Sequence, residues 1–216
     1  MAQIRSKPFG VTKEGANVTE YILSNPGGLT VSVLDYGCVI KSIIVPAKNG
    51  PVDVVVGHDT MADYEADFNS SGSTCCGAFV GRYANRIGGS KFTLYEEEYH
   101  VTPNEGKNCL HSGLHGFDKT VFDMGFEGDD TLVLTAASPD GTDGFPGNAE
   151  LEVRYSLAGA GLMIQYTLTT DAPTVANITN HSYFNLNGHA SGSVLGHRLS
   201  LDAPAYLETD AGSIPT

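Results

Sequence analysis

Short apolar runs with polar alternation recur along the chain, separated by Gly, Pro, Asn and Asp. Residues 29–34 (LTVSVL) alternate with period two, and residues 39–45 (VIKSIIV) form a second run that closes at Pro46. Because successive side chains of a strand point to opposite faces, this pattern predicts β-strands. The same reasoning predicts strands at 52–56, 78–80, 92–94, 121–126, 132–136, 151–157, 163–169 and 175–178, and a strand-like stretch at 198–201.

Helical periodicity is scarce. One short segment, residues 60–65, has Thr60 as a candidate N-cap and acidic residues in its first turn. There is no internal repeat, low-complexity tract or linker, and the chain contains 26 Gly and 10 Pro. Frequent turns between short strands favour an antiparallel sandwich or barrel over alternating βαβ units. We therefore predict an all-β fold, with residues 1–216 forming a single domain.

Composition narrows the classes of partner. Hydrophobic residues make up 41% of the chain and charged residues 17%, and 12 Lys and Arg against 25 Asp and Glu give a formal charge of −13. A negative field of this size repels nucleic acid and anionic membrane surfaces, so neither partner is expected. No apolar run approaches the roughly 18 residues of a membrane span, and residues 1–10 lack the apolar core of a signal peptide.

The four cysteines are Cys38, Cys75, Cys76 and Cys109. Their number and scatter are unlike a secreted disulfide framework, and the adjacent pair lacks the CxxC spacing of a zinc site. We expect free thiols, mostly buried, in a reducing compartment, and hence a cytoplasmic protein.

Residues 81–87 (GRYANRI) follow an apolar run and hold two arginines and an asparagine. If the strand continues through them, Arg82 and Arg86 point to the same face. A guanidinium offers a fixed fork of donors and Asn85 offers both a donor and an acceptor, which suits a ligand rich in hydroxyl groups. An ordinary surface pair of arginines fits the same pattern.

Residues 108–119 (NCLHSGLHGFDK) place His111 and His115 four apart, a spacing that forms a metal pair on a helix. The intervening Gly and Ser predict a loop, and no Glu follows His111 as in zinc proteases, so we predict no metal site. His111 then fits either a ligand contact or a structural hydrogen bond. Residues 140–148 (DGTDGFPGN) fail the EF-hand pattern and predict a tight turn.

Residues 179–186 (TNHSYFNL) gather an imidazole, amides, hydroxyls and two aromatic rings. In a strand, His181, Tyr183 and Asn185 would share one face. Aromatic rings cover the apolar faces of sugars, amides bond to hydroxyl groups, and a histidine exchanges protons near neutral pH. A structural histidine fits this isolated segment equally well.

Together, and in this order along the chain, segments 81–87, 110–119, 143–147 and 180–186, with 36–38 (YGC) and 53–57 (DVVVG), resemble the aldose 1-epimerase family. The resemblance implies a large antiparallel β-sandwich, the galactose mutarotase-like supersandwich, with a sugar cleft on one concave sheet. It also implies interconversion of the α and β anomers of a free aldohexose such as galactose or glucose, without cofactor or metal.

The same resemblance implies roles for single residues. His181 matches the general acid, His111 a supporting histidine that contacts the sugar, Asn85 and Arg86 an Asn-Arg pair at the site, and Tyr183 a weaker contact. Mutarotation removes the proton of the anomeric hydroxyl and delivers one to the ring oxygen, which requires an acid and a base. In the family, the general base is a glutamate, and it and a sugar-binding aspartate would fall beyond Thr216. We therefore expect that this chain carries the general acid of the site but lacks its base and the C-terminal strands.

Three other functions stay open at this stage. A hexose-6-phosphate 1-epimerase would need further basic residues around the cleft, which the charge of −13 disfavours. A non-catalytic carbohydrate-binding β-sandwich would bind sugar without accelerating its mutarotation. An inactive fragment would do neither.

Overall fold

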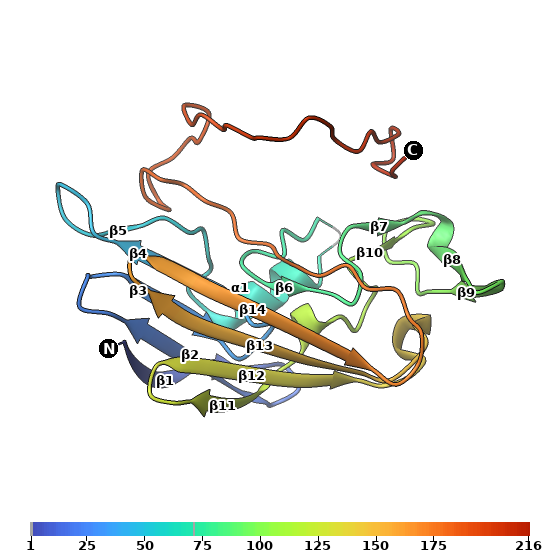
Figure 1. Cartoon of the computed structure of the whole chain (residues 1–216), viewed down its shortest axis with the longest axis horizontal. Coiled ribbons are helices and arrows are strands. Elements are labelled where there is room, and N and C mark those ends of the chain that lie inside the picture. The colour runs from blue at the N-terminus through green and yellow to red at the C-terminus, as the bar shows by residue number, and fades with distance from the viewer. Residues whose placement is uncertain (1, 71) are drawn as a thin grey trace.

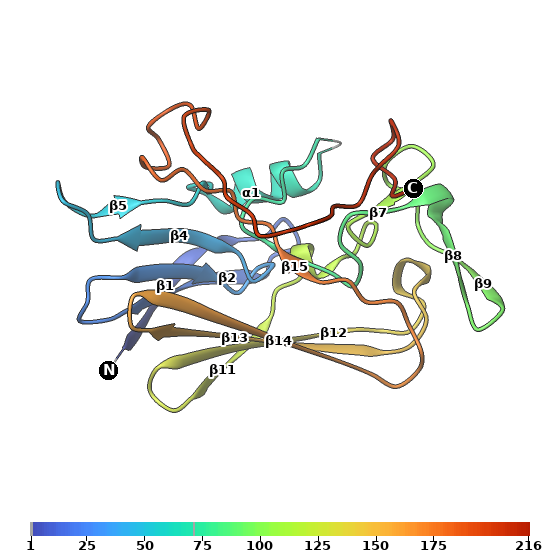
Figure 2. The same cartoon turned by 45° about the horizontal axis from the view of Figure 1, so that its top comes forward.

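Two antiparallel sheets lie one over the other in the computed structural model, which describes residues 2–70 and 72–216 (Figures 1 and 2). The first sheet has five strands paired in chain order, and the second has four, also in chain order. The first consists of β1 (Gln3–Val11), β2 (Asn17–Ser24), β3 (Thr30–Leu34), β4 (Ile40–Val45) and β5 (Val52–Asp53). The second consists of β11 (Asp123–Glu127), β12 (Thr131–Ser138), β13 (Ala149–Ala158) and β14 (Gly161–Thr170). The predicted all-β antiparallel sandwich is confirmed.

The core fills the space between the two sheets. Val31 and Val33 of β3 belong to the same core cluster as Leu132 and Leu134 of β12, and all four side chains are fully buried. The alternation of buried and more exposed positions along β12 and β13 directs one face of the sheet inward. Burial of these branched side chains is the main favourable contribution to this architecture.

The predicted helix forms as α1 (Met61–Phe68), and Thr60 caps it by accepting a hydrogen bond from the Asp63 N–H. The helix extends three residues beyond the predicted end at residue 65. Phe68 stacks on Tyr36 with ring centroids 5.9 Å apart, which buries this end of the helix against the connection between β3 and β4.

Three two-stranded ribbons lie beside the sandwich and hold the loops described below. They pair β6 (Phe79–Val80) with β15 (Thr179–Asn180), β7 (Arg86–Ile87) with β10 (Cys109–Leu110), and β8 (Lys91–Leu94) with β9 (Glu97–His100). Short 3₁₀ helices, η1 (Gly88–Ser90), η2 (Phe117–Lys119) and η3 (Thr142–Gly144), complete the regular structure of this region.

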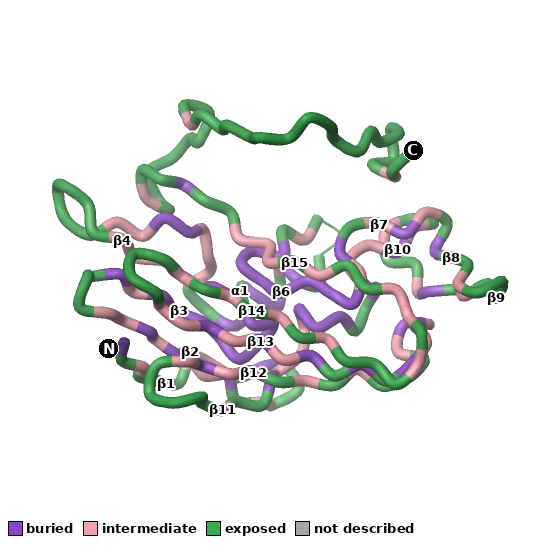
Figure 3. Tube along the Cα trace, viewed as in Figure 1, coloured by how far each residue is buried: buried purple, intermediate pink, exposed green. Residues whose placement is uncertain are grey.

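Two predicted strands are wrong. Residues 175–178 contain one isolated bridge, at Asn177, and the strand follows at β15 instead. The stretch 198–201 is extended but exposed, with Leu199 at 83% and Leu201 at 72% exposure, and it pairs with no other strand in the described chain (Figure 3). An apolar run becomes a strand only where a neighbouring backbone completes its hydrogen bonds.

The remaining strand predictions hold with shifted ends, and six strands of the structure lie outside the predicted ranges. These are β1, β2, β7, β9, β10 and β15. No α-helix among the described residues is long and apolar enough to cross a bilayer. The single domain over residues 1–216 stays a prediction.

Candidate active site

The ribbon of β7 and β10 brings the Asn-Arg pair to the first histidine. Leu110 pairs with Arg86 and Cys109 with Ile87, so the residues just outside this register, Asn85 and His111, are neighbours. The His111 N–H donates to the Asn85 carbonyl at 3.0 Å. Antiparallel pairing thus joins two motifs whose residues Asn85 and His111 lie 26 positions apart in the sequence.

A second hydrogen bond fixes the imidazole of His111. The backbone N–H of Asn85 donates to its Nδ1 at 3.0 Å. Since Nδ1 accepts, this bond assigns the proton of the neutral ring to Nε2. The side chain therefore presents an N–H donor on the edge of the ring away from Asn85.

The electrostatic surroundings keep this ring neutral. Burial, reinforced by the charges of His181 and Arg86, lowers the pKa of His111 from 6.5 to about 4. A cation at this position would lose hydration and lie close to other positive groups. Near neutral pH, His111 is therefore suited to donate a hydrogen bond and unsuited to release a proton.

The ribbon of β6 and β15 positions the second histidine. The His181 N–H donates to the Ala78 carbonyl at 2.8 Å, and the His181 carbonyl accepts from the Gly77 N–H at 3.2 Å. Its ring meets that of His111 edge to face, with centroids 5.3 Å apart and an interplanar angle of 79°. Within the described chain, no protein group hydrogen-bonds to the His181 ring.

The predicted common face of residues 181, 183 and 185 forms only in part, because Asn185 departs from it. Pairing with β6 ends at Asn180, and the chain then forms an isolated antiparallel bridge between Phe184 and Val55. Tyr183 is 45% exposed and its ring lies 5.2 Å from that of His181, whereas Asn185 is 1% exposed. Asn185 instead donates through its side chain to the Gly192 carbonyl at 3.1 Å, a structural role.

The side chains of the two arginines in the 81–87 motif point to different surroundings, because strand β6 ends at Val80 and its alternation does not reach them. Arg82 is 2% exposed and its guanidinium bonds to the carbonyls of Ser138, Pro139 and Pro146, which fastens the turn before β13. Arg86 points elsewhere and forms a two-point ion pair with Glu105. The predicted common face of Arg82 and Arg86 is therefore wrong.

Asn104 shapes the loop that carries His111, and the sequence interpretation missed it. Its side-chain amide donates to the carbonyls of Leu110 and Gly113 at 2.9 and 3.0 Å. Its side-chain oxygen accepts from the Leu110 N–H at 2.7 Å. A single asparagine thus closes the loop from both sides of His111, whose φ is +53°.

Asp143 braces the far side of the same loop. Its carboxylate accepts from the N–H groups of Leu114 and His115 at 3.1 and 2.7 Å. Gly113 has φ +93°, and a Cβ there would lie 2.8 Å from the Asp143 carboxylate, so glycine is required. The turn at 140–148 is confirmed, and its function is to hold this loop.

The spacing of the two histidines in this loop does not bring them together at a metal site. The His115 side chain is 75% exposed and its Nδ1 lies 3.3 Å from Asp143. Across residues 2–70 and 72–216, no group of three or more His, Cys, Asp or Glu side chains is arranged to hold a metal ion.

A hollow of about 250 Å³ opens beside His111. Arg86, Glu105 and Lys119 also line it, as does Asp118, which is 1% exposed. Burial raises the pKa of Asp118 to about 6, and the nearby Lys119 ammonium, 3.7 Å from its carboxylate, opposes that rise. The hollow is thus walled by polar groups whose opposite charges are paired, which suits a neutral, hydroxylated ligand.

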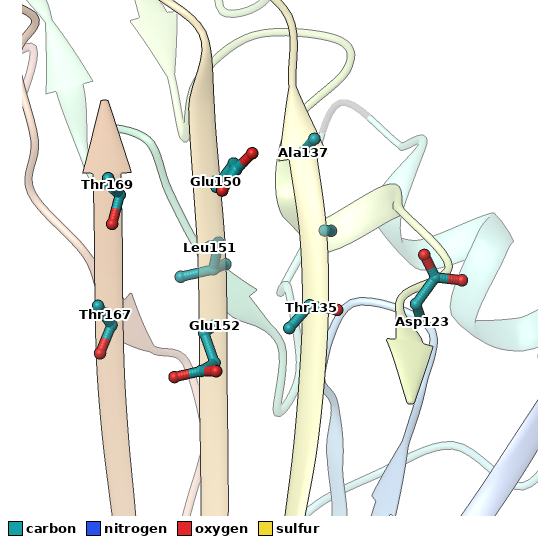
Figure 4. A pocket seen from close by; sticks show the side chains of 9 residues that line it. Asp123, Thr135, Ala137, Glu150, Leu151, Glu152, Thr167 and Thr169 are labelled. Atoms are coloured by element: carbon teal, nitrogen blue, oxygen red, sulfur yellow. The ribbon is translucent and has the colours of Figure 1, made fainter. Parts of the chain in front are cut away.

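A different hollow, of about 480 Å³, lies on the outer face of the second sheet (Figure 4). Three acidic side chains, Asp123, Glu150 and Glu152, line it together with threonines of β12 and β14. Its lining contains neither an aromatic ring nor a basic group, so it lacks the groups that place sugars and transfer protons.

A family model described as aldose 1-epimerase matches residues 19–216. The galactose mutarotase of Sus scrofa is 35% identical over 222 residues, covering 100% of this chain and 62% of that protein. The aldose 1-epimerase of Escherichia coli (strain K12) is 36% identical over 195 residues, covering 89% of this chain and 55% of that protein. The chain thus spans less than two thirds of the length of these curated relatives.

Solved structures agree with the sequence matches. The GalM/aldose epimerase homologue from C. elegans superposes with a TM-score of 0.82 at 30% identity, covering 98% of this chain and 60% of that one. The galactose 1-epimerase from Lactobacillus acidophilus NCFM gives a TM-score of 0.74 at 27% identity, covering 86% of this chain and 54% of that one. The chain belongs to the aldose 1-epimerase family.

Proposed function

We propose that the protein is a mutarotase, an isomerase that interconverts the α and β anomers of a free aldohexose such as galactose or glucose. The observation that carries the proposal is the meeting of His111 and His181, whose rings lie 5.3 Å apart beside the pair Asn85 and Arg86. Relatives named galactose mutarotase and aldose 1-epimerase support the same reaction.

The geometry supports a different catalytic role for each of the two histidines. His111, neutral and held at Nδ1, donates from Nε2 to a sugar oxygen and orients the ring. His181, with no protein partner for its ring within the described chain, delivers a proton to the ring oxygen as the C1–O bond opens. Rotation about C1 and reclosure then yield the other anomer.

The reaction also needs a base for the anomeric hydroxyl. The carboxylates of the hollow serve other purposes, because Glu105 is bound to Arg86 and Asp118 is buried beside Lys119. The family resemblance implies that a glutamate in the family's C-terminal portion is the base. Catalysis by the whole protein is proposed on that assumption.

Two features favour a free sugar over a hexose 6-phosphate. The formal charge of −13 repels an anionic substrate at long range. At short range, the Lys119 ammonium lies 3.7 Å from the Asp118 carboxylate, so it is not a free cation for a phosphate.

We also propose a reducing, cytoplasmic location. All four cysteines are free and buried. Burial raises the pKa of both Cys75 and Cys76 to about 11, so these thiols stay protonated and unreactive. Fractionation of cells that express the protein, with probing for its thiols, tests this location.

The test of the reaction is polarimetry of fresh α-galactose with the full-length gene product. His181→Ala should lower the catalysed rate at least about hundredfold, the range typical of a lost general acid. His100→Ala, on the exposed β8–β9 hairpin, is the matched control and should keep the wild-type rate. A wild-type rate in His181→Ala would contradict the assignment. Galactose binding without any acceleration in the wild type would instead identify a non-catalytic sugar-binding protein.

A further inference from the structure

Two neighbouring side chains, those of Glu105 and Asn85, hold the guanidinium of Arg86. Its Nε and one terminal nitrogen each donate to Glu105 at 2.6 Å, in the parallel two-point geometry that is strongest for this pair of groups. The side chains are 23% and 35% exposed, and both line the hollow beside His111. The ion pair is therefore part of the wall of this hollow beside His111.

Glu105 is itself anchored. It begins a four-residue turn in which its N–H donates to the Asn108 carbonyl at 3.1 Å and its carbonyl accepts from the Asn108 N–H at 2.9 Å. Gly106 supplies the positive φ, +60°, that this turn requires. The preceding residue, Asn104, closes the His111 loop. One short turn thus positions both the arginine and the histidine of the site.

The bonds of Arg86 determine what it offers to a ligand. A guanidinium has five N–H donors; two go to Glu105 and one goes to the Asn85 side chain at 3.1 Å, which leaves two. The adjacent carboxylate also cancels the positive charge, and its own pKa is held below the usual range by Arg86. What remains is an oriented donor with little net attraction for an anion.

We propose that Glu105 is a positioning residue that also determines specificity: its ion pair aims Arg86 and neutralises it, so that the hollow favours sugar hydroxyl groups over a phosphate. The inference rests on the proposed function in that the ligand is a sugar. The pairing with Arg86 is a property of the chain that can be measured without any sugar.

The experiment compares the 216-residue chain with Glu105→Gln and with Glu98→Gln, a control on β9 whose carboxylate pairs with Lys91 at 2.8 Å away from the hollow. Binding of galactose and of galactose 6-phosphate is followed by NMR. Glu105→Gln should weaken galactose binding and strengthen galactose 6-phosphate binding, changing their affinity ratio about tenfold or more. Glu98→Gln should leave the ratio unchanged, and thermal unfolding verifies that each variant is folded.

A ligand-free measurement separates the two proposals. The Nε–H resonance of Arg86, assigned with Arg86→Lys, should exchange slowly with water in the wild type and rapidly in Glu105→Gln. Inorganic phosphate should bind better to Glu105→Gln than to the wild type. If the sugar function fails its polarimetry test but both of these effects occur, the role of Glu105 still stands. An unprotected Nε–H in the wild type, or equal phosphate binding by both proteins, overturns the role of Glu105.

Discussion

The second sheet and the loops around His111 follow different rules of construction. Strands β12, β13 and β14, which are described throughout, contain no residue other than glycine with positive φ. The inward apolar side chains of β12 and β13 are mostly buried, and those of β14 are partly buried. In the site, three residues other than glycine have a positive φ: Asn85 at +64°, His111 at +53° and Ser112 at +72°. Each costs of order 1 kcal/mol or more in backbone strain.

Unfavourable backbone conformations thus occur in the loops of the site and not in strands β12, β13 and β14. The loops tolerate strain because specific side-chain bonds replace the regular ladder: Asn104 and Asp143 hold the His111 loop, and Ser112 accepts from the Tyr83 N–H at 2.8 Å. Fixing the rings in advance lowers the entropic cost of binding a sugar. The sandwich supplies stability, and part of that stability supports a rigid site.

Removing core volume from the sandwich should have the largest effect on stability. Leu134, fully buried between Met124 and Val153 in the ladder, is replaced in Leu134→Ala. The lost burial and the remaining cavity should lower the free energy of unfolding by about 2–5 kcal/mol. Met163→Ala, at a position 57% exposed on β14, should change it by less than about 0.5 kcal/mol. Urea denaturation measures both, and equal values for the two variants would contradict the assigned core.

The sandwich was the predictable part. Alternation identified 132–136, 151–157 and 163–169 because one face of these strands is buried and the other is open to water. It failed for β1, whose mostly exposed residues and Pro8 belong to an edge strand without an apolar face. It failed for β2 because Glu20, whose carboxylate accepts a hydrogen bond from Ser32, occupies a buried position and interrupts the apolar pattern.

Opening the His111 loop should have an intermediate effect. Asn104→Ala removes three hydrogen bonds at an exposed position, for an expected loss of about 1–2 kcal/mol in the free energy of unfolding. Hydrogen exchange should quicken at residues 110–113 and stay unchanged in β12–β14. Asn17→Ala, at the exposed first residue of β2, is the control. Faster hydrogen exchange throughout the sandwich would show that the His111 loop does not open independently of the two sheets.

The site was predicted only through the family motifs. Those motifs led to Asn85, Arg86, His111, His181 and Tyr183, which the structure brings to one region, although their roles stay predictions. Asn104 and Glu105 were missed because asparagine, glutamate and glycine before a strand are typical of any turn. The distinguishing signal, a carboxylate opposite Arg86, depends on the pairing of β7 with β10, which no local pattern reveals.

The smallest expected effect is a pH dependence that belongs to the loop alone. The pKa of His111 is about 4 in the folded protein and about 6.5 in the unfolded chain. Well above pH 6.5, the imidazole is therefore neutral in both the folded and the unfolded state. As the pH falls from 6.5 towards 4, the unfolded chain binds a proton that folded His111 refuses, and stability is lost. Solvent screening limits the loss to about 1 kcal/mol between pH 7 and pH 5.

His111→Gln should remove that part of the pH dependence, whereas His100→Gln on the exposed hairpin should keep it. Asp118, whose pKa is raised to about 6, contributes with the opposite sign in the same range, since its folded state binds a proton more readily than the unfolded chain. The difference between wild type and His111→Gln cancels this contribution, because Asp118 is present in both. Urea midpoints at pH 7 and pH 5 give the value. A difference of zero would mean that the ring is protonated in the folded state, and the donor role assigned to its Nε2 as a neutral ring would then be wrong.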